Sequence, residues 1–185
     1  MRVLLINPPI KNIIRLEMPL FVREMEGPFP PLGLMYIASY LKKHEGCEVR
    51  ILDSVAEEKD YKEIEKYIQG FRPDIVGVTV HTHNLIDVIM VVDMIKRIDR
   101  GIYVCLGGPH VNIFPQKSIN IPSADFVVQG EGEVTFTELV RFLKCNGDLN
   151  KVKGLLFKQN GKCVNTGPRE DRGETLPRSL RSTRA

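Results

Sequence analysis

The sequence has no tryptophan, only four cysteines and no long apolar run, and each shortage narrows what the chain can be. No apolar stretch approaches the ~20 residues that a membrane-spanning helix needs, and the apolar part of the N-terminus is too short for a signal peptide. The cysteines, Cys47, Cys105, Cys145 and Cys163, are far apart and include no C-x-x-C pair. This spacing argues against a metal site or a disulfide framework within the chain, so we expect a reducing cytoplasm.

A large excess of charge is also missing. The 185 residues contain 26 Lys and Arg against 23 Asp and Glu, a net charge of +3. Five arginines and three acidic residues between positions 168 and 185 account for +2 of that total, so the rest of the chain is close to neutral. A basic nucleic-acid surface is therefore not predicted. The apolar content of 43% is typical of one globular domain.

Short apolar runs alternate with helical periodicity along the chain. The predicted strands are Val3–Ile6, Glu48–Leu52, Ile75–Val80, Ile102–Leu106 and Asp125–Val128. The predicted helices are Leu32–Lys43, Asp60–Gly70, Asn84–Ile98 and Gly132–Cys145, with one further helical turn near Gln116–Ile119. The third helix is expected to be capped by Asn84 and to turn Leu85, Ile89, Val92 and Ile95 inward.

Strands that are apolar throughout imply burial on both faces, and alternation with helices implies a parallel sheet. The predicted fold is α/β, a flavodoxin-like (Rossmann-like) doubly wound sheet of five parallel strands in the order 2-1-3-4-5. Leu155–Lys158 and Lys162–Asn165 predict a small C-terminal hairpin around an Asn160-Gly161 turn. Residues 1–166 would form the domain, and the apolar-poor residues 167–185 would be a linker or disordered tail.

In an open parallel sheet, ligands bind beyond the carboxyl ends of the strands, so the loops that follow the strands are the candidate site. The first of these loops, residues 7–31, is about 25 residues long and rich in proline. The candidate binding residues in these loops are Pro8, Pro9, Gly33, Thr79, His81, Thr82, His83, Asn84, Gly107, Gly108, Pro109, His110, Gly130, Glu131, Gly132 and Glu133. Each group alone also fits a tight turn or a solvated loop, and what favours a site is that all are expected on one rim. No catalytic residue and no metal ligand is predicted.

Several common ligand sites do not fit. Gly130-Glu131-Gly132 leads to Thr135 where a dinucleotide fingerprint needs a third glycine, and it does not follow the first strand. No G-x-x-x-x-G-K-[ST] motif occurs. A phospho-receiver domain needs acidic residues where the first and third strands end, and Asn7-Pro8 and Thr79–Thr82 stand there instead.

Six motifs, taken in order, resemble a known family. They are Ile6-Asn7-Pro8-Pro9, Pro30-Pro31-Leu32-Gly33-Leu34-Met35-Tyr36-Ile37-Ala38, Val49-Arg50-Ile51-Leu52-Asp53, Pro73-Asp74-Ile75-Val76-Gly77-Val78-Thr79, Leu106-Gly107-Gly108-Pro109-His110 and Asp125-Phe126-Val127-Val128-Gln129-Gly130-Glu131-Gly132-Glu133. The set resembles the cobalamin (B12)-binding domain at the N-terminus of class B radical SAM proteins. The resemblance covers roughly residues 1–165, and each motif alone is weak.

The resemblance implies that 79–84, 107–110 and 130–133 line a channel for the cofactor's nucleotide tail. In the related methionine-synthase type of domain, a D-x-H-x-x-G motif supplies a histidine to cobalt. Aligned on Gly33, Pro30 stands at that histidine position, so cobalamin is expected to bind without a histidine from this loop. His81, His83 and His110 remain the other imidazoles that could reach cobalt.

The resemblance also implies a C-terminal radical SAM domain that holds a [4Fe–4S] cluster and S-adenosylmethionine on a C-x-x-x-C-x-x-C motif, which this chain lacks. Thr175-Leu176-Pro177 resembles the linker to that domain, although Arg178-Ser179 departs from its usual continuation. By itself the chain would be a binding module, and methyl transfer or related radical chemistry would belong to the full-length protein. Two alternatives stay open: a docking domain that has lost cobalamin, and a flavin or nucleotide binder.

Overall fold

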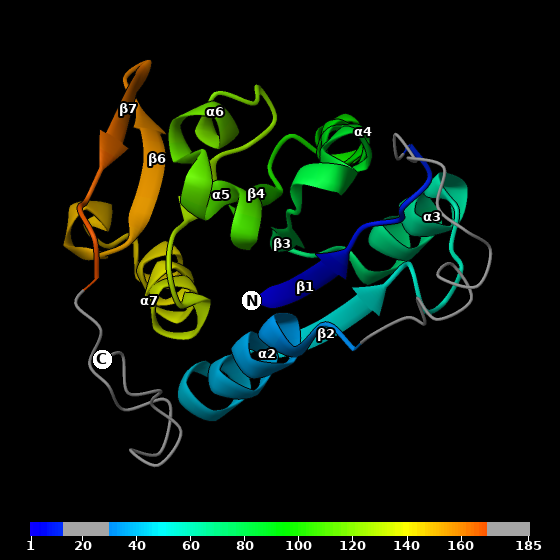
Figure 1. Ribbon diagram of the computed structural model, residues 1–185. Helices are drawn as coiled ribbons and strands as arrows, with labels where there is room; N and C mark the ends of the chain where they lie inside the picture. Colours follow the sequence, from blue (N-terminus) through cyan, green and yellow to red (C-terminus); the bar gives the residue numbers. More distant parts are fainter. Residues whose placement is uncertain (13–29, 170–185) are drawn as a thin grey trace, which may run out of the picture.

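The computed structural model describes residues 1–12 and 30–169, which are built around one seven-stranded sheet (Figure 1). The strands stand in the order β2-β1-β3-β4-β5-β6-β7. Their bounds are β1 Arg2–Asn7, β2 Glu48–Asp53, β3 Ile75–Thr79, β4 Tyr103–Gly107, β5 Phe126–Val128, β6 Leu155–Gln159 and β7 Lys162–Asn165. Strands β1 to β5 pair in parallel, whereas β5 with β6 and β6 with β7 pair antiparallel.

The prediction of a five-stranded parallel sheet was therefore wrong in extent, because β6 and β7 extend the sheet instead of standing apart from it. Leu155, Leu156 and Phe157 are buried, and they pair with the three residues of β5. These apolar side chains continue both layers of the core beyond the parallel strands. Asn160 and Gly161 join the two strands, and both have positive φ, as a type I′ turn requires.

Helices cover both faces of the sheet. The bounds are α2 Leu32–Glu45, α3 Tyr61–Phe71, α4 Leu85–Ile98, α5 Pro109–Ile113, α6 Pro115–Ile119 and α7 Gly132–Cys145, with short 3₁₀ turns at Thr82–Asn84 and Leu149–Lys151. In Figure 1, α2 and α7 lie together on one side of the sheet, and α3 and α4 lie on the other. Each pair encloses its own apolar core, because the central strands bury side chains on both faces.

Local chemistry explains where the helices begin and end. At α3, Asp60 accepts a hydrogen bond from the backbone N–H of Glu63, whose side chain bonds back to the N–H of Asp60. This reciprocal capping box is one of the strongest helix-start signals in a sequence. Helix α2 ends at Gly46, whose φ of 57° is the left-handed conformation that terminates helices.

Asn84 stands at the N-cap position of α4, the third of the four long helices predicted, but the expected side-chain cap is not formed. The Asn84 side chain makes no capping bond to α4 and instead accepts from the backbone N–H of His81 at 2.9 Å. The preceding residues form a 3₁₀ turn, so the asparagine closes that turn. Ile89 was also expected to face inward, but it is 36% exposed, whereas Val92 and Ile95 are buried as expected.

The end of the described chain stays against the domain. Arg169 forms an ion pair with Glu138 on α7, and its Nε donates to Thr135 Oγ1 at 3.0 Å. The chain is thus in contact three residues past the expected boundary at 166. The predicted tail from residue 170 onward, and most of the long loop after β1, lie outside the described residues. Within the described ranges, no helix is long and apolar enough to cross a membrane.

Candidate functional site

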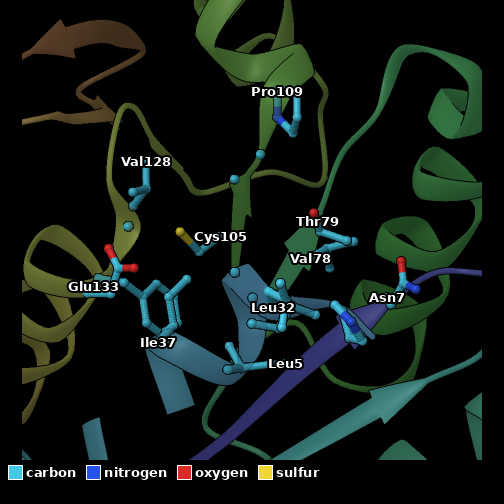
Figure 2. Close-up of a pocket in the computed structure, with 18 of the residues that line it drawn as sticks. Leu5, Asn7, Leu32, Ile37, Val78, Thr79, Cys105, Pro109, Val128 and Glu133 are labelled. Carbon is cyan, nitrogen blue, oxygen red and sulfur yellow. The ribbon is translucent and has the colours of Figure 1, made fainter. Parts of the chain in front are cut away.

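A cavity of about 500 Å³ opens at the carboxyl ends of the central strands, between the sheet and helices α2 and α7 (Figure 2). The chain segments that follow β1, β3, β4 and β5 form its rim, as expected for an open parallel sheet. Its lining residues are Leu5, Asn7, Pro30, Pro31, Leu32, Gly33, Leu34, Ile37, Gly77, Val78, Thr79, His81, Cys105, Gly107, Gly108, Pro109, Val128, Gly130, Glu131, Gly132, Glu133 and Phe136.

Small side chains on the sheet make the floor of the cavity. Gly77 lies in the middle of β3, and a Cβ there would come within 2.8 Å of Leu5 Cδ2 and 3.3 Å of Phe136 Cζ. Beside it on β4 is Cys105, whose thiol pKa is raised by burial, so it remains a neutral thiol. Gly77 thus lets Leu5 and Phe136 pack directly against the strand, and with Cys105 they form an apolar floor.

The turn after β4 contains two glycines with different roles. Gly108 has a φ of 104°, and a Cβ there would meet Thr79 Oγ1 and the carbonyl oxygen of Val80, each at 3.0 Å. This glycine is needed for the close approach of the turn to the end of β3. At Gly107, by contrast, a Cβ would meet nothing within 4 Å, so this position opens into the cavity.

The turn after β5 carries the chain into α7. Gly130 has a φ of 72°, and its N–H donates to Asn112 Oδ1 at 2.9 Å. A Cβ at Gly132 would come within 2.9 Å of Ile37 Cδ1, so this glycine lets the start of α7 approach α2. These glycines bring the two helices together over the sheet and set the width of the cavity.

Glu133 stands in the first turn of α7 and lines the cavity. Figure 2 places it beside Ile37, on the opposite side of the cavity from Asn7 and Thr79. Its Oε2 atom is buried and has no hydrogen-bond partner among the described residues. A buried acceptor without a donor is rare in folded proteins and calls for an explanation.

The three predicted histidines lie in different places. Among the described residues that line the cavity, His81 is the only histidine, and its ring stacks on His83 with centroids 5.3 Å apart. Burial, with a smaller contribution from His83, lowers the pKa of His81. His110 is buried away from the cavity, with Nδ1 3.0 Å from Thr82 Oγ1. Burial first, and then Lys117, lower the pKa of His110.

The cavity brings together ten of the sixteen predicted binding residues. They are Gly33, Thr79, His81, Gly107, Gly108, Pro109, Gly130, Glu131, Gly132 and Glu133. The six that do not line it are Pro8, Pro9, Thr82, His83, Asn84 and His110. Pro8 and Pro9 are themselves buried, and Asn84 is occupied by its bond to the N–H of His81.

Several cavity residues were missed because they lie inside secondary structure. Gly77 could have been found, since a lone glycine in a buried strand marks a close approach. Ile37 and Phe136 were assigned to helices but not to a site, because periodicity does not separate core positions from cavity positions. Asn7 was noted only as a strand end; its side chain donates to Asp53 Oδ1 at 2.9 Å and so faces the neighbouring strand as well as the cavity.

The cavity offers no cluster of metal-binding side chains. Within residues 1–12 and 30–169, no three His, Cys, Asp or Glu residues lie close enough together to hold an ion. Pro30 and Pro31 line the cavity, and their ring nitrogens are amide nitrogens that neither donate a hydrogen bond nor bind metals. The arrangement suits an organic group that is held by apolar walls and a few polar contacts at the rim.

Comparison with known families agrees with this geometry. The family model described as the B12 binding domain matches residues 18–140. An uncharacterized methyltransferase of Pyrococcus horikoshii is 39% identical over 170 residues, which is 91% of this chain and 35% of that protein. The anaerobic magnesium-protoporphyrin IX monomethyl ester cyclase of Rubrivivax gelatinosus is 31% identical over 163 residues, covering 84% of this chain and 29% of the cyclase. The chain thus spans about a third of the length of these relatives.

The fold matches a solved structure as well. The radical S-adenosylmethionine methyltransferase TsrM from Kitasatospora setae, solved with cobalamin and a [4Fe–4S] cluster bound, superimposes with a TM-score of 0.74 at 23% identity. The match covers 95% of this chain and 31% of TsrM. At this identity the comparison establishes a shared α/β fold.

Proposed function

This chain belongs to the B12-binding domain family, and from this premise we propose that it holds cobalamin with the nucleotide tail inserted in the cavity between the sheet and helices α2 and α7. The observation that carries the proposal is the cavity itself, which is about 500 Å³ in size and lies at the edge of the sheet where an open α/β fold takes its ligands. It would serve as the N-terminal module of a larger protein.

The residues of the cavity fit the parts of that tail. The floor of Gly77 and Cys105, with Leu5 and Phe136 beside it, suits a flat apolar heterocycle such as dimethylbenzimidazole. A sugar and a phosphate need polar partners instead, and the rim supplies the side chains of Thr79, His81 and Glu133. Burial of the base in the cavity would hold it away from cobalt.

The cofactor would supply an organometallic cobalt centre, and the residues of this chain bind and orient it. Pro30 stands where the related methionine-synthase domains carry a cobalt-binding histidine, and proline has no donor atom for the metal. We therefore infer that this segment would supply no imidazole to the cobalt. The apolar walls would exclude water from the tail.

The chemistry of the whole protein is a further part of the proposal. This chain spans about a third of its relatives, and its four cysteines are dispersed, with Cys47 and Cys105 buried. A [4Fe–4S] cluster and S-adenosylmethionine would therefore be held by a C-terminal radical SAM domain, which is the expected partner of this one. Methyl transfer or a related radical reaction would take place between the two domains.

A titration with hydroxocobalamin tests the proposal. We expect one corrinoid per chain to co-elute with the protein on gel filtration, with a visible spectrum in which the tail base is displaced from cobalt. Flavin mononucleotide, run in parallel, should not co-elute. If a sample with an α/β circular-dichroism spectrum retains no corrinoid, the same titration on the full-length protein distinguishes an incomplete site from a domain that has lost the cofactor.

A further inference from the structure

We propose that the buried Oε2 atom of the half-buried Glu133 side chain accepts a hydrogen bond from a ribose hydroxyl of the corrinoid tail, and that this contact makes the domain select corrinoids with a complete nucleotide tail. The inference rests on the proposed function, because it assigns a specific contact within the cavity that would hold the tail. Glu133 would thus be a specificity-determining residue.

The first support is the missing partner of Glu133. Its Oε2 atom is buried, and the residue belongs to none of the ion pairs among the described residues. Removing one acceptor oxygen of a carboxylate from water without a compensating donor is unfavourable, even though the side chain as a whole is only half-buried. A ligand that donates a hydrogen bond to this atom offsets the unfavourable free energy, so the unpaired oxygen favours the ligand-bound state.

The second support is that Glu133 differs from the other unpaired buried groups. Two hydroxyls, of Ser54 and Thr137, also lack partners, but neither lines the cavity. Thr137 lies in α7, where a hydroxyl can rotate to donate to a carbonyl of the preceding turn, and Ser54 lies in the turn after β2, on the other side of β1 from the cavity strands β3 and β4. An ionised carboxylate can only accept, and it must therefore find a donor.

The third support is the match between an acceptor and the groups of the tail. The tail phosphate is an anion and would be repelled by the carboxylate, and neutral dimethylbenzimidazole has no N–H. The ribose hydroxyls are the donors that remain in the tail. The ribose would therefore lie on the α7 side of the cavity, next to Glu133, and the phosphate would lie farther from this side chain.

The amide side chains of the corrin ring also carry N–H donors, and cobinamide separates them from the sugar. Cobinamide keeps the amides and lacks the ribose and the base. If Glu133 binds the ribose, its removal should weaken cobalamin and leave cobinamide unaffected. If it binds an amide, both corrinoids should weaken together.

The experiment compares dissociation constants for hydroxocobalamin and cobinamide in the unchanged protein, Glu133→Leu and Glu133→Gln. Glu133→Leu should weaken cobalamin between about 10- and 100-fold, because the ribose hydroxyl then becomes the unpaired buried group. Glu133→Gln keeps an acceptor and should lie between the other two proteins. Glu48→Leu is the matched control, since Glu48 is exposed at the amino end of β2.

Two results would overturn the inference: an equal loss for both corrinoids, or no loss for cobalamin in Glu133→Leu. Thermal unfolding of each ligand-free variant checks the fold, so that a loss of binding is not mistaken for a loss of structure. Failure of both the unchanged chain and the full-length protein to retain cobalamin would instead contradict the proposed function, and the two failures are thereby distinguished.

Discussion

Asp87 on α4 and Glu133 on α7 are both carboxylates in the first turn of a helix, on opposite faces of the same sheet, and their surroundings differ. Asp87 is fully buried and accepts from the backbone N–H groups of Lys11 and Asn12 at 3.2 and 3.1 Å. It also accepts from Asn12 Nδ2 at 2.9 Å and from the hydroxyl of Tyr61. Glu133 has an oxygen with no donor.

The difference separates a structural role from a ligand-binding role. On the α3/α4 face every oxygen of the buried carboxylate has donors, and these donors tie the start of the loop after β1 to two helices. Burial, and then the bond to Asp87, raise the pKa of Tyr61 to about 12, which keeps its hydroxyl available as a donor. On the α2/α7 face the space and the acceptor are left unfilled, as a binding site requires.

The largest expected effect comes from filling the cavity. Gly107→Trp places an indole where a Cβ meets nothing within 4 Å, so it should occupy the cavity with little strain in the fold. We expect cobalamin affinity to fall at least about 100-fold, since the tail and the indole compete for one space. Equilibrium binding followed by the visible spectrum measures the loss.

The matched control for this variant is Lys66→Trp, on the exposed surface of α3. The chain has no tryptophan, so each variant carries a single one, and its emission, excited selectively beside the five tyrosines, reports whether the indole is buried. Unchanged cobalamin binding in Gly107→Trp, with a buried indole, would show that the tail is held elsewhere.

The next effect tests the opposite face. Asp87→Ala removes the shared acceptor of Tyr61, Asn12 and Lys11, and should lower the free energy of unfolding by about 2–4 kcal/mol. Urea denaturation measures it. Asp87→Asn should lose less, because one oxygen still accepts. A loss smaller than about 0.5 kcal/mol in Asp87→Ala would mean that water replaces the carboxylate at no cost and that the α3/α4 face is not locked by it.

Glu133→Leu, by contrast, is not expected to lower the stability of the ligand-free protein, and its effect should be smaller than that of Asp87→Ala. Removing an acceptor that has no donor, and adding apolar area beside Ile37, should leave the free energy of unfolding unchanged or raise it by up to about 1 kcal/mol. The same urea series measures it. Destabilisation comparable to that of Asp87→Ala would mean that Glu133 has a structural partner, and the contrast between the two carboxylates would fail.

Much of this contrast is out of reach of the sequence. Runs such as Ile75–Val80 predict buried strands because the signal lies within a few consecutive residues. The start of α3 at Asp60 can be predicted for the same reason. The pairing of β6 with β5 is not local, because it depends on a neighbour about 30 positions away, and it was missed. Asn84 was misread because the same side chain fits either a helix cap or a tight turn.

The site divides in the same way. The glycines after β4 and β5 could be predicted, since they stand where strands end and helices begin. The sequence does not distinguish Gly107, which opens into the cavity, from Gly108, which only permits the turn to approach Thr79. The burial of Glu133 Oε2 depends on elements that pack around the start of α7, so the sequence of that helix alone does not predict it.

His81 and His110, whose pKa values are lowered in the folded protein, lie in different regions. Their effect on the pH dependence of stability is the smallest that we expect. His81 lines the cavity, whereas His110 packs with Thr82 outside it. Because burial lowers the folded-state pKa of His110 below its ordinary value of 6.5, the unfolded chain takes up the proton first as the pH falls through about 6.5. The contribution of His110 to stability should therefore be constant above this pH, decline below it, and level off under the folded-state pKa.

His110→Gln should reduce the decline in unfolding midpoint between about pH 7.5 and 5.5, and His44→Gln, at an exposed histidine of α2, should not. An undiminished decline in His110→Gln would show that protonation of His110 does not contribute to the loss of stability.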